Sequence, residues 1–240
     1  MGSNRRMDHM TWPEFKEAKT RPVIVPIGST EQHGQHLPIG TDAVLATRVA
    51  EDLAERIDGT VLPTLSYGYK SKPLSGGGPL FPGTIDMNGV TVINQMHDVL
   101  SELIADGFTK IVVMNAHFEN EAFIVEAIDL VTRETGGVAT IVETNWWDPV
   151  PQSVIDKVFD GLVFPAGHWS MRPSPNFVDA PLCAGTGAHG PYGRGSRCHG
   201  EILCPLPVRQ GDVPAHGGLA NPAGSSAERG RLIAERAWVR

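Results

Sequence analysis

Two short apolar runs, each followed directly by acidic and histidine side chains, constrain the fold of this chain more than any other feature. Residues 23–28 precede the polar segment 31–36, and residues 111–114 precede the polar segment 115–120. Runs of this length that are rich in β-branched residues are typical of strands buried in a parallel sheet. Because the carboxyl ends of such strands face the ligand crevice of an open α/β sheet, we expect the two polar segments to meet there.

The polar residues in these segments are of the kinds that bind divalent metals. Glu31 and His33 follow the first run, Asp42 lies nine residues beyond that histidine, and His117 and Glu119 follow the second run. Carboxylates and imidazoles in this number suit two divalent ions that share one carboxylate. The alternative is that these are ordinary polar residues of surface loops. That interpretation would be preferred if the sequence held only a single histidine here. The pairing of Glu-x-His with His-x-Glu favours a metal site.

Strand-like and helix-like segments alternate through roughly the first 145 residues. Such alternation with short connections predicts an α/β fold with three layers, α/β/α, and a mainly parallel sheet. We expect further strands at 60–65 and 138–143, in addition to the two apolar runs, and helices at 41–57, 87–105 and 119–135.

The first predicted helix begins beside a candidate metal ligand. Thr41 and Asp42 can cap it, so Asp42 is either a helix cap or a ligand, and the neighbouring cluster favours the ligand role. Its apolar face is expected to consist of Val44, Leu45, Val49 and Leu53.

Charge and cysteine content exclude several classes of function. The net charge of −7 argues against nucleic acid, which needs a basic surface. No apolar run approaches the length of a membrane span, and residues 2–9 lack the core of a signal peptide. Three cysteines (Cys183, Cys198 and Cys204) cannot form a disulfide framework, which favours a cytoplasmic location. We expect one domain over residues 1–240 that acts on a small molecule.

Several motifs together resemble the creatininase (creatinine amidohydrolase) family. They occur in the family's order and at its spacing between about Val23 and Asp148. The resemblance implies a metal-dependent amidohydrolase that hydrolyses a C–N bond in a small cyclic amide, creatinine or a close analogue, and a homo-oligomer, a hexamer. The matching positions are residues 28–34, Asp42, and residues 67–71, 75–78, 81–84 and 115–120.

The resemblance also implies a role for each candidate ligand. Glu31 and His117 would hold one metal, His33 and Glu119 the other, and Asp42 would bridge the two. The cofactors would be two divalent ions, zinc or manganese, that activate a water molecule. Glu119 would in addition be catalytic, by helping to orient the nucleophile.

Three further residues are candidates for binding the substrate. Ser75 opens a glycine run and corresponds to a serine beside the family's substrate; the alternative is a surface loop. Trp147 matches an aromatic residue that stacks on a small planar ring; the alternative is a core tryptophan. Phe118 stands where creatinine-hydrolysing members carry tyrosine, so it argues against creatinine itself. His36 is off the family's pattern, and we expect it at the surface or behind the ligands.

Residues 167–207 depart from the pattern of the rest of the chain. They are rich in glycine and proline and have no amphipathic period, which is the composition of a disordered insertion. The family carries a Trp-x-x-Glu-His segment in this region. A one-base shift in the coding sequence from Ala166 would permit it, and a second shift from Asn176 would permit the start of the next helix. The original frame would return between Glu201 and Val208, so three single-base deletions account for the segment.

Two other functions remain open on the sequence alone. One is a different hydrolase of the same family, acting on a keto-inositol, a formamide or a peptide terminus. The other is a metal-binding scaffold with impaired catalysis, which follows if residues 167–207 are the true polypeptide.

The mass of the protein made from the natural gene distinguishes a true segment from a frame error. If the frame hypothesis is correct, the intact mass will differ from the 25.8 kDa of the written chain. The coding DNA from Ala166 to Val208 will then contain the missing bases. A mass equal to that of the written chain would contradict the hypothesis and favour the scaffold.

Overall fold

The computed structural model describes residues 5–35, 37–71 and 78–158, and their centre is a parallel sheet of four strands. The strand order is β2-β1-β3-β4, with each pair parallel. The predicted α/β class is therefore confirmed. The strands are β1 (Val23–Ile27), β2 (Thr60–Val61), β3 (Lys110–Asn115) and β4 (Thr140–Asn145).

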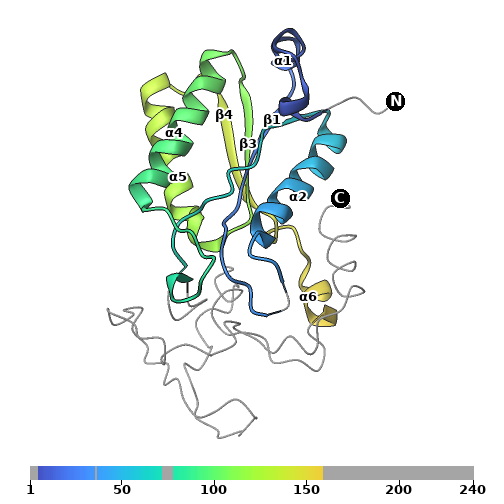
Figure 1. Ribbon diagram of the computed structural model, residues 1–240. Helices are drawn as coiled ribbons and strands as arrows, with labels where there is room; N and C mark the ends of the chain where they lie inside the picture. The colour runs from blue at the N-terminus through green and yellow to red at the C-terminus, as the bar shows by residue number, and fades with distance from the viewer. Residues whose placement is uncertain (1–4, 36, 72–77, 159–240) are drawn as a thin grey trace, which may run out of the picture.

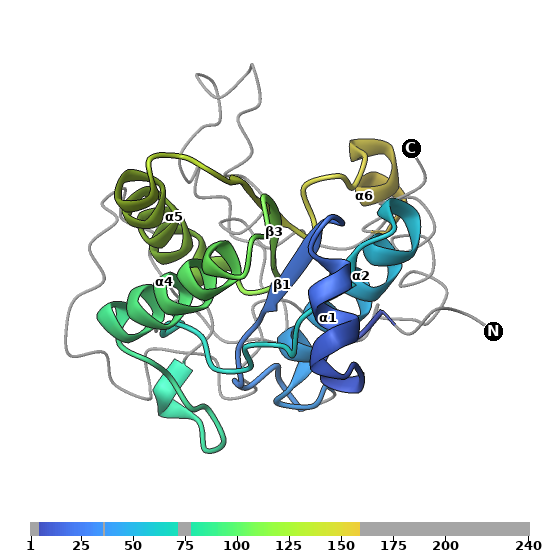
Figure 2. The ribbon, with the colours of Figure 1, turned by 90° about the horizontal axis from the view of Figure 1, so that it is seen from above.

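Helices cover both faces of this sheet, as Figures 1 and 2 show. The helices α4 and α5 lie on one face and α2 lies on the other, which gives the three predicted layers. None of the described helices is long and apolar enough to cross a bilayer. The helices are α1 (Trp12–Ala18), α2 (Thr41–Ile57), α4 (Gly89–Ala105), α5 (Glu121–Thr135) and α6 (Gln152–Val158), with 3₁₀ turns η1 (Met7–His9), η2 (Gly78–Leu80) and η3 (Phe118–Asn120).

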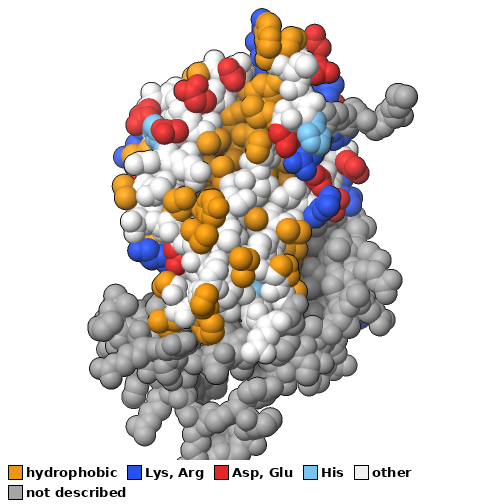
Figure 3. Space-filling model, viewed as in Figure 1, with side chains coloured by type: hydrophobic (Ala, Val, Ile, Leu, Met, Phe, Trp, Pro, Cys, Tyr) orange, Lys and Arg blue, Asp and Glu red, His pale blue; other side chains and the backbone are white. Residues whose placement is uncertain are grey.

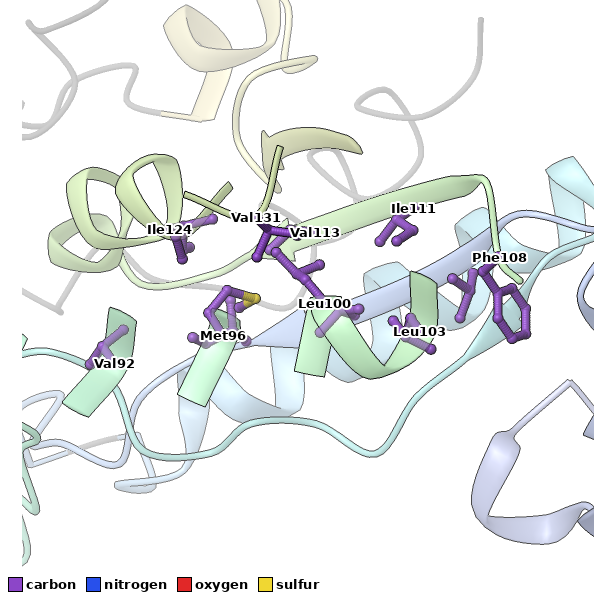
Figure 4. Packing of buried hydrophobic residues seen from close by; sticks show 13 residues of the cluster. Val92, Met96, Leu100, Leu103, Phe108, Ile111, Val113, Ile124 and Val131 are labelled. Carbon is purple, nitrogen blue, oxygen red and sulfur yellow. The ribbon is translucent and has the colours of Figure 1, made fainter. Parts of the chain in front are cut away.

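The larger part of the core lies between the sheet and the α4–α5 pair. Side chains of α4 spaced three and four residues apart point into this layer, as expected for an amphipathic helix. They meet the alternating inward residues of β3 and the buried face of α5 (Figure 4). The buried residues of this cluster include Val92, Met96, Leu100, Leu103, Ile111, Val113, Ile124 and Val131.

The opposite face of the sheet is packed differently from the prediction. Alanines at positions 46, 50 and 54 form the buried stripe of α2, whereas Val44 is 57% exposed. The predicted Leu45, Val49 and Leu53 are only partly buried. Small side chains let the helix axis approach the strands closely, so the stripe nearest the sheet consists of alanine and the larger residues flank it.

The second strand is shorter than the predicted range 60–65. Beyond Val61 the chain still follows β1, with the Leu62 N–H donating to the Ile24 carbonyl and the Leu65 N–H to the Pro26 carbonyl. Between these two bonds, three residues of this segment span only two residues of β1, so the regular ladder ends there. The predicted strand 138–143 lies two residues further on, as β4.

The strands end in register where the polar segments begin. Ile27 pairs with Asn115, and Asn115 pairs with Asn145, so three strands reach their carboxyl ends at one level. The polar segments that follow these strands therefore begin at the same edge of the sheet.

Two valines of α4 provide a test of the core. Val92 is 1% exposed and Val90 is 64% exposed, on the same helix. We expect Val92→Ala to lower the free energy of unfolding by about 2 kcal/mol, because it removes buried methyl groups and leaves a cavity. Val90→Ala should change it by less than about 0.5 kcal/mol. Equal effects of the two substitutions in urea unfolding would contradict this packing.

Candidate active site

The loop after β1 brings the first carboxylate of the site next to the start of α2. A Cβ at Gly28 would lie 2.5 Å from the Ala43 backbone nitrogen, so only glycine permits this approach. The Glu31 N–H donates to the Ile39 carbonyl at 2.9 Å, which ties the loop back to the turn before the helix. The N-cap of α2 is Gly40, not Asp42, and Asp42 is buried in the first helical turn, where the residue is 5% exposed.

The segment after β3 is held by buried asparagine side chains. Asn120 donates to the Gly28 carbonyl at 3.0 Å and accepts the Tyr69 N–H at 2.8 Å. Asn115 accepts the His117 N–H at 3.1 Å and donates to Asn145 at 2.8 Å. These amides join the ends of β1, β3 and β4 to the loop through Tyr69, and sequence reasoning assigned them no role. The sequence feature that could have indicated this role is an asparagine at the end of each of two neighbouring strands, Asn115 and Asn145.

One carboxylate joins the two predicted pairs of ligands. Asp42 Oδ1 lies 2.9 Å from His33 Nε2, and Asp42 Oδ2 lies 3.1 Å from His117 Nδ1. Glu31 Oε1 lies 3.3 Å from the same His117 nitrogen, and Glu119 Oε2 lies 3.6 Å from His117 Nε2. Glu31, His33 and His117 thus lie around Asp42, whereas Glu119 contacts the other ring nitrogen of His117.

Backbone carbonyls determine which nitrogen each imidazole presents to the carboxylates. His117 Nε2 lies 2.8 Å from the Tyr69 carbonyl, and His33 Nδ1 lies 3.2 Å from the Glu31 carbonyl. A carbonyl oxygen only accepts, so these nitrogens carry the protons. His117 therefore directs Nδ1 at the cluster and His33 directs Nε2. A second contact of this kind is typical of histidines that bind metals.

The carboxylates raise the proton affinity of both rings. Burial alone would lower the pKa of His117, but hydrogen bonds and charges from Asp42 and Glu31 outweigh it and raise that pKa well above its ordinary value. The same balance, with Asp42 as the main partner, raises the pKa of His33. Burial would raise the pKa of Asp42, yet the bonds to His117 and His33 lower it. A cation is therefore favoured at the position that the Asp42 oxygens face.

The donor set fits a divalent metal ion. Ligand atoms of Glu31, Asp42 and His117 all lie within 4.8 Å of one another. Carboxylate oxygen and imidazole nitrogen suit zinc and manganese. Ser71 adds a hydroxyl that donates to Glu31 Oε2, which leaves Oε1 directed at the cluster.

A pocket of ≈ 180 Å³ opens over these ligands. Phe118 and Trp147 form part of its wall, with ring centroids 6.2 Å apart, and Trp146 meets Trp147 edge-on at 5.9 Å. Both predicted aromatic substrate residues therefore border the pocket. Ser75 and His36 lie outside the described residues, as does the whole segment 167–207.

A partly buried carboxyl group lies beneath the start of α5. Glu143 of β4 has no hydrogen-bond partner for Oε1. Burial, together with the charges of Glu121 and Asp148, raises the pKa of Glu143 to about 7. The folded protein therefore binds a proton at Glu143 more tightly than the unfolded chain does.

This raised pKa makes stability depend on pH in a definite direction. The contribution of Glu143 is present below its ordinary pKa of 4.5 and is lost as pH rises through about 7. We expect Glu143→Gln to exceed the wild type by about 1–2 kcal/mol in unfolding free energy at pH 8, after allowance for solvent screening, and to match it near pH 4.5. Glu126→Gln, at an exposed position of α5, should show no such pH dependence in denaturant titrations. An equal difference at both pH values would rule out the assignment to Glu143.

Comparison with known proteins finds hydrolases that are similar to this chain. The family model described as "Creatininase: Creatinine amidohydrolase" matches residues 8–190. The creatinine amidohydrolase of Pseudomonas putida is 34% identical over 94% of this chain and 90% of its own length. The 3-dehydro-scyllo-inosose hydrolase of Thermotoga maritima is 32% identical over 65% of this chain and 51% of its own.

Solved structures agree with the sequence relatives. The structure titled "Creatininase Mn" has a TM-score of 0.80 and 33% identity, covering 98% of this chain and 95% of its own. A mutant creatininase of the "Zn-Zn type" also has a TM-score of 0.80, with 31% identity and the same coverage of both chains.

Proposed function

Since the chain belongs to the creatininase family and is a hydrolase, we propose that it opens a C–N bond in a small cyclic amide, creatinine or a close analogue. The observation that carries the proposal is the Asp42 carboxylate, which contacts imidazoles on both sides directly beneath an aromatic-walled pocket. The relative from Pseudomonas putida carries the name of this activity.

The proposed ligands divide into two groups around Asp42. Glu31 and His117 would hold one divalent ion, His33 and Glu119 the other, and Asp42 would be shared between them. When bound, zinc or manganese would supply Lewis acidity and lower the pKa of a water molecule. The fixed imidazole orientations support this division, because His117 and His33 contact different oxygens of Asp42.

Glu119 is the residue proposed to orient the nucleophile. Its carboxylate is largely buried, lines the pocket, and lies beside His117. An acceptor at this position can align an attacking water and receive its proton.

The aromatic wall would orient the substrate. Trp147 is proposed to stack on a planar ring, and Phe118, tilted 34° to it, would close the adjacent side. Such contacts exclude water and restrict the substrate to one orientation over the metals. Ser75 is retained as a further candidate for binding the substrate.

The second candidate is another hydrolysis within the family. Phe118 favours it, because phenylalanine offers no hydroxyl to a ring substituent of the substrate. The inosose hydrolase relative shows that related chains carry the names of other activities. A panel of creatinine, a keto-inositol, a formamide and a peptide would separate the candidates by kcat/KM. We further propose a cytoplasmic homo-oligomer.

Replacement of Asp42 tests the shared ligand. Asp42→Asn keeps the size of the side chain but removes its charge, so we expect divalent-metal affinity to fall by more than about 100-fold. Turnover of creatinine should fall by a similar factor. The measurements are metal content after dialysis and product formation by NMR.

A matched control lies on the same helix. Asp52→Asn, at an exposed position of α2, should retain metal and turnover. Full metal occupancy in Asp42→Asn would contradict the bridging role. A wild-type chain that binds metal but turns over none of the panel would support the scaffold.

A further inference from the structure

A short segment between β2 and α4, residues 68–71, contacts two of the candidate metal ligands. The chain after β2 passes in front of β1 and reaches the carboxyl ends of the strands (Figure 1). In Figure 3 most charged side chains lie over the upper half of this face, and the surface over the strand ends is mainly hydrophobic or uncharged. Ser71 and His117 are each 3% exposed, so their polar contacts come from the protein itself.

Each of these contacts leaves one particular ligand atom available to a metal. The Tyr69 carbonyl lies 2.8 Å from His117 Nε2, so Nδ1 is the ring nitrogen that remains for a metal. The Ser71 hydroxyl donates to Glu31 Oε2, so Oε1 is the carboxylate oxygen that remains. These two remaining atoms, Glu31 Oε1 and His117 Nδ1, lie 3.3 Å apart. The 68–71 segment therefore selects the two atoms that are assigned to the same ion.

The histidine of the other ligand pair is oriented by a different part of the chain. His33 Nδ1 lies 3.2 Å from the Glu31 carbonyl, which belongs to the loop after β1. The Glu31 N–H donates to the Ile39 carbonyl at 2.9 Å, which holds this loop in place. Both contacts use backbone atoms, so replacement of a side chain in the 68–71 segment leaves them intact.

The 68–71 segment is itself fixed by the end of β1 and by α5. A Cβ at Gly68 would lie 2.6 Å from the Gly28 carbonyl oxygen, so only glycine permits this close approach. The Tyr69 N–H donates to Asn120 Oδ1 at 2.8 Å. The Tyr69 ring packs against Phe123 of α5, with ring centroids 4.1 Å apart. These contacts hold the Tyr69 carbonyl at the position that faces the imidazole.

We propose that Ser71 and the Tyr69 carbonyl position the ligands of one metal ion and leave the other ion unaffected. They are positioning groups, because they touch ligands and not the substrate. The inference rests on the proposed function, in which Glu31 and His117 hold one of two ions. Loss of an outer contact of this kind typically lowers metal affinity by about 10–100-fold. The two ions should therefore be separable by substitutions that remove no ligand.

Zinc binding to the metal-free full chain tests the proposal. Ser71→Ala should raise the dissociation constant of one zinc ion by about 10–100-fold and leave that of the second ion unchanged. Phe123→Leu, which shortens the side chain that supports Tyr69, should weaken the same ion. Ser66→Ala is the matched control, because this hydroxyl donates to the Thr64 carbonyl instead of a ligand, and it should bind both ions. Circular dichroism verifies that each variant is folded.

Cadmium NMR identifies which ion is weakened. The wild type should give two metal signals, and the signal that correlates with the His117 ring protons should shift or disappear in Ser71→Ala. A general structural defect would instead change both signals. A wild type that binds no divalent ion would overturn the ligand roles together with this inference. Binding of two ions by the wild type, with both or neither weakened in Ser71→Ala, would overturn this inference alone.

Discussion

The carboxylate of Asp42 is the group on which the assembly of the site depends. It contacts His33 through one oxygen and His117 through the other, and these histidines come from different strand ends. A carboxylate buried to this degree is stable as an anion only beside positive charge or hydrogen-bond donors. Protonated imidazoles supply this in the metal-free protein, and divalent ions would supply it in the loaded one. Metal and protons therefore compete for the same ring nitrogens.

Small residues make this contact geometrically accessible. Gly28 lets the first turn of α2 approach the end of β1, and the alanine stripe of α2 keeps the rest of the helix close to the sheet. Larger side chains at these positions would move Asp42 away from both histidines. The packing of α2 against the sheet therefore determines where Asp42 lies, although the glycine and alanines that permit this packing cannot bind a metal or a proton themselves.

Most of the fold was predictable because hydrophobic period and strand ends are local signals. The five candidate ligands could be named from the sequence because carboxylates and imidazoles follow two buried strands directly. The features that the sequence did not predict depend on contacts between residues that are distant in the sequence. The alanines of α2 are buried because the sheet lies beneath them, which the apolar period around Val49 did not reveal. Asn120 acts through Gly28 and Tyr69, which are far away in sequence, and the charge of Glu121 acts on Glu143 because of where α5 begins. Residues 167–207 lie outside the described residues.

The asparagine network has a consequence for how such a site can diversify. Tyr69 and His117 are held by amide side chains of Asn120 and Asn115, whereas Phe118 and Trp147 present aromatic rings to the pocket. Exchange of an asparagine for an isosteric aspartate would remove a donor and loosen several segments together. Exchange of an aromatic wall side chain would change the shape of the pocket above the candidate ligands. The residues that position the candidate ligands therefore differ from the residues that shape the pocket. Substrate selectivity can then change while the positions of the candidate ligands stay the same.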